Sequence, residues 1–351
     1  MNADFILAIG ELGKEKGIDP ELLFQAVEEA LVTAYKKNFG SNQNVRVDMN
    51  KVTGELHIYA QRHIVAEVGD DPNEISLEEA RKIDPRYEVD DIVETEVTPR
   101  NFGRIAAQNA KQVVVQRIRE AERGMVFEKF SSRENDIVTG IIQRMENKNV
   151  YIDLGKAEAI LTPNEQIPGE IYQYHDRMKT YIVEVKKTSK GPQIMVSRTH
   201  PGLLKRLFEL EVPEIHDGLV EIKSVAREPG MRSKISVYTK DENIDPVGAC
   251  VGHKGMRVQT IVNELRGEKI DIVKYSSEPD QYVANALSPA KVVSTEVLEE
   301  EKICRVIVPD YQLSLAIGKE GQNARLAAKL TGWKIDIKSE SQAAEEAEQG
   351  A

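Results

Sequence analysis

The sequence predicts a multidomain α+β protein, with an α+β N-terminal domain, a small β-barrel and two copies of one α/β unit. Three observations predict this class. The 351 residues are 40% hydrophobic, which is enough to form several separate cores. The spacing of apolar residues changes along the chain from helical periodicity to the two-residue alternation of strands. Finally, one glycine loop and the strand that follows it occur twice in the C-terminal part, as in a duplicated fold.

Changes in pattern and composition place the expected domain boundaries. The expected parts are an N-terminal domain at 1–133, a barrel at 134–200, two repeated units at 201–276 and 277–339, and a flexible acidic tail at 340–351. The net charge is −11, and the acidic excess lies mainly in the first part and the tail. Because phosphate binding depends on local Lys and Arg contacts, any nucleic-acid-binding surface must be a local patch.

The N-terminal domain is expected to begin with two helices followed by a β-hairpin. The second helix has a candidate N-cap in Asp19, Pro20 at its first position and Gly40 after its last turn. Alternation over 45–49 and 56–58, around a Thr-Gly turn, predicts the hairpin. The apolar side chains at helical spacing, expected to face the core, are Leu23, Ala26, Val27, Ala30, Leu31, Ala34 and Tyr35.

A further long helix is predicted from about Arg100 to Arg123, and it is unusually basic for this acidic domain. Its basic residues before the first acid are Arg100, Arg104, Lys111, Arg117 and Arg119. Such a run is either a solvated helix face or a surface that contacts RNA or another polyanion. The sequence leaves both interpretations open.

Five short alternating segments in 134–200 predict a closed β-barrel of the OB type. Their order, and the phrases 138–140, 150–154 and 194–198, resemble the S1-type RNA-binding domain. Such barrels bind RNA by stacking bases on aromatic rings. The candidate side chains are Tyr151 on a strand and Tyr172, Tyr174, His175 and Arg177 in a loop. A strand tyrosine serves equally well in core packing.

The repeat is the most informative feature of the sequence. Val251-Gly252-His253-Lys254-Gly255 returns as Ile317-Gly318-Lys319-Glu320-Gly321, and the strands at 267–272 and 332–337 follow with one residue of slip. Each copy reads as strand, short helix, Gly-x-x-Gly loop, longer helix and strand, preceded by a helix. This order resembles the KH unit of the bacterial type (type II). A single Gly-x-x-Gly is commonly a turn or helix cap, but two copies in matched contexts favour a functional loop.

KH units hold about four nucleotides of single-stranded RNA, because glycine lets the sugar-phosphate backbone approach and the next helix offers free N–H groups. Glu320 departs from this chemistry, since an acid inside the second loop repels phosphate. We therefore expect the second loop to depend more on backbone amides. The predicted RNA-binding residues are Gly252, His253, Lys254, Gly255, Arg257, Gly318, Lys319, Glu320, Gly321, Gln322 and Asn323.

The domain order and several further phrases resemble the NusA family of bacterial transcription elongation factors, in its short form without C-terminal acidic repeats. The phrases are 16–19, 34–37, 98–108, 116–122 and the two loops. The resemblance implies that the N-terminal domain binds RNA polymerase near the RNA exit channel, with possible contact residues Arg100, Arg104 and Lys111. It also implies binding of nascent single-stranded RNA, effects on pausing and intrinsic termination, and antitermination with other Nus factors.

Several classes of site and location are not expected. No stretch approaches the roughly 20 apolar residues of a membrane helix, and the N-terminus lacks a charged signal-peptide start, so we expect a cytoplasmic protein. We also expect a monomer. Cys250 and Cys304 have no partner at metal-ligand spacing, which predicts buried thiols, no metal site and no cofactor.

Two other functions share these modules. S1 and KH units also accompany RNA-degrading phosphorolytic enzymes, but the sequence has no P-loop, H-E-x-x-H or G-x-S-x-G motif and no motif that groups carboxylates as metal ligands. We therefore expect no enzymatic activity. A ribosome-associated or translation factor is the second alternative, and a pull-down of ribosomal subunits or of RNA polymerase would separate it from a transcription factor.

Overall fold

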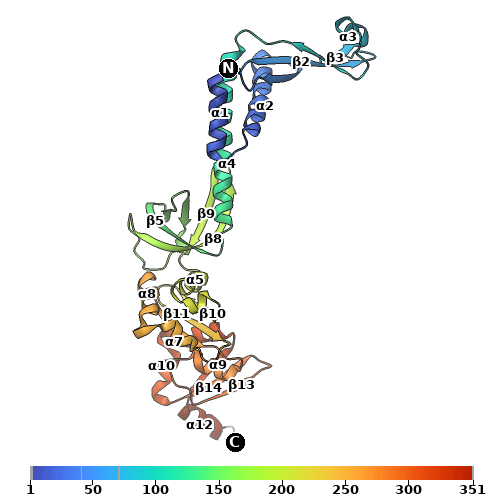
Figure 1. The fold of residues 1–351 in the computed structure, drawn as a ribbon. Helices are drawn as coiled ribbons and strands as arrows, with labels where there is room; N and C mark the ends of the chain where they lie inside the picture. Colours follow the sequence, from blue (N-terminus) through green and yellow to red (C-terminus); the bar gives the residue numbers. More distant parts are fainter. Residues whose placement is uncertain (1–2, 41, 70–71, 350–351) are drawn as a thin grey trace. The chain divides into compact units, whose positions relative to one another are not determined.

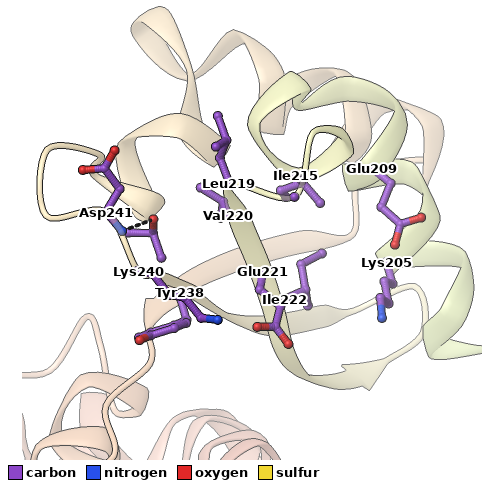
Figure 2. A pocket seen from close by; sticks show the side chains of 12 residues that line it. Lys205, Glu209, Ile215, Leu219, Val220, Glu221, Ile222, Tyr238, Lys240 and Asp241 are labelled. Carbon is purple, nitrogen blue, oxygen red and sulfur yellow. Dashed lines mark hydrogen bonds between the residues drawn. The ribbon is translucent and has the colours of Figure 1, made fainter.

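The computed structural model describes residues 3–40, 42–69 and 72–349 (Figure 1). The chain forms two compact units, Met1–Val126 and Phe127–Ala351. The boundary between them falls within helix α4 (Phe102–Ser131). In the described part of the chain, no helix is long and apolar enough to cross a membrane.

The N-terminal unit contains the expected helices α1 (Ala3–Lys16) and α2 (Pro20–Phe39). The Asp19 carboxylate accepts the Glu21 N–H at 2.9 Å, and Gly40 ends α2 with a left-handed φ of 61°, which confirms both predicted caps. Helix α4 differs from the prediction at both ends. Arg100 lies in the turn before it, and the helix continues past Arg123 to Ser131 because the buried Phe130 extends its apolar pattern beyond Gly124.

The sheet of this unit contains the predicted hairpin, with Val47 opposite Ile58 in an antiparallel pair. Strand β2 also pairs in parallel with β3 and antiparallel with β4, which the sequence analysis did not predict. A small second core under β3 consists of Ile64, Ile75, Ala80 and Val93. The elements are β1 (Asn44–Met49), β2 (Leu56–Val65), β3 (Glu74–Ser76), α3 (Leu77–Ile83) and β4 (Ile92–Glu96).

The second unit begins with the predicted five-stranded barrel, which closes in the order β5-β6-β7-β9-β8. Gly140 on β5 is required by this closure, since a Cβ there would lie 2.4 Å from Ile152 Cγ2. The strands are β5 (Ile137–Glu146), β6 (Asn149–Asp153), β7 (Glu158–Leu161), β8 (Arg177–Thr188) and β9 (Gly191–Ser197).

The two repeated units have the same topology, which confirms the predicted tandem KH fold. In each, the first two strands pair antiparallel and the last pairs parallel with the middle strand. The first KH unit consists of α5 (Pro201–Glu211), α6 (Pro213–His216), β10 (Val220–Glu228), β11 (Arg232–Thr239), α7 (Pro246–Val251), α8 (Met256–Glu264) and β12 (Lys269–Lys274). The second KH unit consists of α9 (Pro279–Ala286), β13 (Ser294–Leu298), β14 (Ile303–Val308), α10 (Leu313–Ile317), α11 (Gln322–Thr331) and β15 (Lys334–Ser339).

The sheet of the first KH unit is covered on both faces. Its own helices cover one face, and Ala226 and Val273 on the other face belong to the core of the second KH unit. The Tyr282 hydroxyl of α9 hydrogen bonds to Ser236 Oγ at 2.8 Å, and buried Lys234 donates to the Ser288 carbonyl at 2.8 Å. The two KH units therefore share a packed interface. The thiols of Cys250 and Cys304 are free and buried as predicted, and burial raises the pKa of Cys250 to about 12.

The predicted flexible tail is instead helix α12 (Glu340–Gln349) over its described part. Asp310 caps its start, because the Ser341 N–H and Oγ donate to that carboxylate at 3.2 and 2.8 Å. Glu346 forms an ion pair with Lys338 on β15. The capping carboxylate lies 31 residues away along the chain, so the local sequence does not reveal it.

Candidate nucleic-acid interface

The two glycine loops have nearly identical backbones. The first glycines, Gly252 and Gly318, have φ of 72° and 78°, and the second glycines, Gly255 and Gly321, have φ of 77° and 74°. The residue before each second glycine is also left-handed, with φ of 50° at Lys254 and 53° at Glu320. The internal repeat therefore extends from residue types to dihedral angles.

The first and second glycines meet different surroundings. A Cβ on Gly252 would lie 2.6 Å from Arg257 Cγ, and one on Gly318 would lie 2.7 Å from the Asn323 nitrogen. A Cβ on Gly255 would meet no atom within 4 Å, and one on Gly321 only the Arg325 guanidinium at 3.9 Å. The fold thus requires the first glycines for its own packing, whereas the second leave an open backbone surface that a ligand can approach.

Two predicted RNA contacts, Arg257 and Asn323, occupy equivalent positions and support the loops from within. Arg257 Nη1 donates to the Ala249 carbonyl at 2.6 Å and forms an ion pair with Glu214 at 2.9 Å. Asn323 is 5% exposed, and its amide donates to the carbonyls of Ala316 and Leu287, each at 3.0 Å. The predicted phosphate contact of Asn323 is therefore corrected to a structural role, because its side chain is buried and its amide hydrogens are already bonded.

The tips of both loops are exposed. His253 and Lys254 project from the first loop, and Lys319 and Glu320 from the second. Among the described residues neither lysine has an ion-pair partner, so both ammonium groups are available to phosphate. Gln322 at the start of α11 is less available, since its amide donates to Glu228 at 2.8 Å.

The barrel candidates are not equally available. The Arg144 guanidinium lies 3.7 Å from the Tyr151 ring centroid and is held there by Glu158, so one face of that ring is occupied. Tyr172 is structural, because its hydroxyl donates to Glu170 and accepts the Ile167 N–H, and burial raises its pKa. His175 is exposed in the predicted turn.

Arg177 and Tyr174 lie on either side of that turn. Arg177 is the first residue of β8 and not a loop residue as predicted, because it pairs with Ile141 on β5. Its side chain remains exposed. Tyr174 is 55% exposed. Tyr174, His175 and Arg177 thus form one exposed group on the barrel, where the His175 N–H donates to the Ile142 carbonyl of β5 at 2.9 Å.

Buried charges join the barrel to the first KH unit, and the sequence analysis did not identify them. Arg198, directly after β9, is 1% exposed and binds Glu170, the Lys179 carbonyl at 2.8 Å and Glu264 at 3.3 Å. Glu264 also binds Lys179 Nζ at 3.1 Å. Since Glu264 ends α8, this network anchors the helix that begins at the first glycine loop.

A second buried pair, Arg227 and Glu268, lies nearby. Two hydrogen bonds of 2.8 and 2.9 Å join them, and Glu268 also accepts from Ser233 Oγ and the Gly230 N–H. Burial disfavours the charged carboxylate of Glu268, but the hydrogen bonds and charge of Arg227 outweigh it and lower the pKa.

Two of the predicted basic residues, Arg104 and Lys111, form a short exposed strip on α4. Arg104 and Lys111 are seven residues apart, which places them on one face of the helix, and both are exposed. Arg100 is exposed in the preceding turn. Arg117 is partly neutralised by Glu120 at 3.3 Å.

Comparisons with known proteins match nearly the whole chain. Four family models match consecutive stretches: the NusA N-terminal domain at 4–124, the S1 RNA binding domain at 131–197, the NusA-like first KH domain at 198–275 and the NusA-like second KH domain at 279–345. The solution structure of the N-terminal domain of NusA from Bacillus subtilis is 55% identical, with a TM-score of 0.32, and covers 35% of this chain and 99% of that one.

Curated relatives extend this similarity over nearly the full length. The chain is 66% identical to the transcription termination/antitermination protein NusA of Halalkalibacterium halodurans, over 98% of this chain and 90% of that protein. It is 65% identical to the protein of the same name from Bacillus subtilis, over 98% of this chain and 93% of that protein. The chain belongs to the NusA family of transcription termination/antitermination proteins.

Proposed function

We propose that the chain holds nascent single-stranded RNA with its two glycine loops and binds RNA polymerase through its N-terminal unit. In this way, acting as a cytoplasmic monomer with other Nus factors, it modulates pausing, intrinsic termination and antitermination. The observation that carries the RNA-binding part is the matched geometry of the loops, in which each second glycine leaves an open backbone surface.

The chemistry of the first loop is that of a phosphate clamp. Gly255 lets a phosphate approach the backbone, and it precedes α8, whose N-terminus carries the positive end of the helix dipole. Lys254 adds an exposed charge without an ion pair to any described residue. His253 lies beside it. The second loop repeats the backbone but places Lys319 and Glu320 at these positions.

The RNA-binding proposal is tested by placing carboxylates in both loops. We expect that His253→Asp with Lys254→Asp, combined with Lys319→Asp and Glu320→Asp, abolishes binding of a single-stranded RNA oligonucleotide in a fluorescence anisotropy assay. The circular dichroism spectrum should be unchanged because these side chains are exposed. The control is Lys82→Asp on α3, an exposed lysine outside the loops. RNA affinity retained by the loop variant would refute the proposed clamp.

The polymerase-binding proposal is tested on the α4 strip. Arg104→Glu with Lys111→Glu should weaken capture of purified RNA polymerase or of RNA, since both side chains lie exposed on one helix face. If the variant bound both RNA polymerase and RNA normally, the strip would be a solvated helix face without a binding role. The control is Arg81→Glu, an exposed arginine on α3.

The transcriptional effect is measured with purified bacterial RNA polymerase on a template with a defined pause and an intrinsic terminator. We expect the protein to lengthen the pause and increase termination, and the loop variant to lose part of both effects. No change in pause lifetime with the unmodified protein, together with capture of ribosomal subunits in place of polymerase, would favour a translation factor instead.

A further inference from the structure

Arg325 on α11 joins the second glycine loop to the first KH unit. Its Nη1 donates to the Glu320 carbonyl in the loop at 3.1 Å. Its Nε donates to Glu228, the last residue of β10, at 2.6 Å. The carboxylate of Glu228 is mostly buried, whereas the Arg325 side chain is 47% exposed. One guanidinium thus binds the loop backbone with one nitrogen and an acid of the neighbouring unit with another.

Glu228 is fully engaged at this point. Its second carboxylate oxygen accepts the Gln322 amide at 2.8 Å, so it fixes two side chains from the first turn and a half of α11. Its hydrogen bond with Arg325 is the largest cause that lowers its pKa, so the group is charged at neutral pH. Arg325 Nη2, in contrast, makes no hydrogen bond within the described residues.

The first KH unit has no equivalent of this arrangement. The position that corresponds to Arg325 is Gln259, whose amide donates to Asn263 in its own helix at 2.9 Å. The first loop carries its cation at Lys254, whereas the second has Glu320 there. The second KH unit therefore has both Glu320, an acid that disfavours phosphate in the loop, and the nearby Arg325. The first KH unit has neither at the corresponding positions.

We propose that Arg325 contacts an RNA phosphate at the second glycine loop, supplying the charge that Lys254 supplies at the first, and that Glu228 positions it. This proposal rests on the RNA-clamp function proposed above. The free Nη2 is the donor, and the bonds of Nε and Nη1 fix its direction. Because Glu228 belongs to the first KH unit, that unit controls the chemistry of the second loop.

The test compares Arg325→Gln with Arg305→Gln, which removes a similarly exposed, ion-paired arginine from β14. Affinity for a pool of random single-stranded RNAs of about twelve nucleotides, enough for two modules of about four each, is measured against salt concentration. Arg325→Gln should weaken binding about tenfold, the value for a charge-assisted hydrogen bond, and reduce the salt slope by about 0.7. A slope and affinity equal to those of Arg305→Gln would overturn the phosphate contact.

If Glu228 positions Arg325, then removing its negative charge should change RNA affinity in the direction opposite to that expected from charge repulsion alone. Removing an acid near RNA should strengthen binding, but Glu228→Gln should weaken it because Arg325 loses its orientation. The double variant should bind like Arg325→Gln alone. Tighter binding by Glu228→Gln would overturn the positioning role. Arg325→Lys, which keeps the charge but cannot span both acceptors, should retain the salt slope and lose affinity.

The four-residue loop variant separates the two proposals. If that variant retains RNA affinity, the clamp itself is wrong. If it loses affinity while Arg325→Gln behaves like the Arg305 control, only the role of Arg325 is wrong. Thermal unfolding of each variant shows whether a loss of affinity reflects a loss of fold.

Discussion

At the scale of single residues, the two glycines of each loop are needed for different reasons. Gly252 combines a positive φ with a close approach to Arg257, while Gly255 has only the positive φ. Substitution of Gly252 should therefore reduce stability more than substitution of Gly255, whereas substitution of Gly255 should weaken RNA binding more.

We predict that Gly252→Ala costs about 1–3 kcal/mol of unfolding free energy, through strain and overpacking. Gly255→Ala should cost about 1 kcal/mol, because only the left-handed backbone is strained there. In RNA binding Gly255→Ala should be the more damaging, because its methyl group lies on the open surface. Urea denaturation and fluorescence anisotropy measure the two effects. The same ranking in both assays would contradict this division of roles.

The sequence predicted those residues whose partners are local. Asp19 and Gly40 cap α2 through contacts a few residues away, and the glycine loops repeat in order. Asn323 was assigned wrongly to RNA binding and Arg325 was not singled out, because their partners Leu287 and Glu228 lie 36 and 97 residues away. A polar residue after a Gly-x-x-Gly loop looks the same in sequence whether it faces solvent or the core.

At the scale of elements, helix α5 begins with a histidine cap. The Gly202 N–H donates to His200 Nδ1 at 3.0 Å, and the imidazole stacks on Tyr181 with centroids 4.5 Å apart. Burial lowers the pKa of His200 from its ordinary value of 6.5. His200 therefore binds a proton more readily in the unfolded chain than in the folded protein. Once its Nδ1 is protonated, it can no longer accept the Gly202 N–H that caps α5.

We predict that this helix start loses stability as the pH falls below about 6.5. The His200 cap contributes its full stabilisation above the pKa of this histidine in the unfolded chain. That stabilisation is lost as the pH falls through the lower pKa of His200 in the folded protein. His200→Asn keeps a capping acceptor but does not titrate, so its unfolding free energy should fall less between pH 7.5 and 5.5. Urea denaturation at several pH values provides the comparison. Parallel pH dependence in the two proteins would exclude the cap as the source.

The junction between the barrel and the first KH unit depends on Arg198. Arg198→Met should cost about 3–5 kcal/mol, because Glu170 would remain buried without its counter-charge. The matched control is Arg144→Met on the barrel surface, where an exposed ion pair contributes at most about 1 kcal/mol. Urea denaturation followed by circular dichroism measures the unfolding free energy of both variants. Equal losses of unfolding free energy would show that the buried ion pairs of Arg198 contribute no more than an exposed pair.

Element types were easier to predict than element ends. Helix α4 continues to Ser131 because Phe130 packs in the second compact unit. Helix α12 starts where Asp310, in the short 3-10 helix Asp310–Gln312, caps it. Both ends are set by tertiary contacts. The small sheet extension formed by β3 and β4 also lacked a clear pattern, since only Ile75 and Val93 are buried in these two strands.

At the scale of the whole molecule, the net charge of −11 is compatible with RNA binding only if the contacts are few and local. The described lysines at the loop tips meet this condition. The order of the four modules was predicted from the sequence, because each module has its own periodicity and the repeat is explicit. The packing of the second KH unit on the sheet of the first was not, since Ala226 and Val273 read as ordinary strand residues.

If both loops bind RNA as proposed, the packed interface between the KH units makes the pair of loops a bivalent binder. Once one loop holds a strand, the other meets the same strand at an effective concentration that is typically millimolar for short connections. We therefore predict a steep gain in affinity when single-stranded RNA is lengthened from about four nucleotides, the span of one module, to about twelve. Lys319→Asp with Glu320→Asp should remove the gain and leave the affinity for short RNA unchanged. An equal gain in both proteins would mean that the gain does not come from the second loop, and the bivalent interpretation would be wrong.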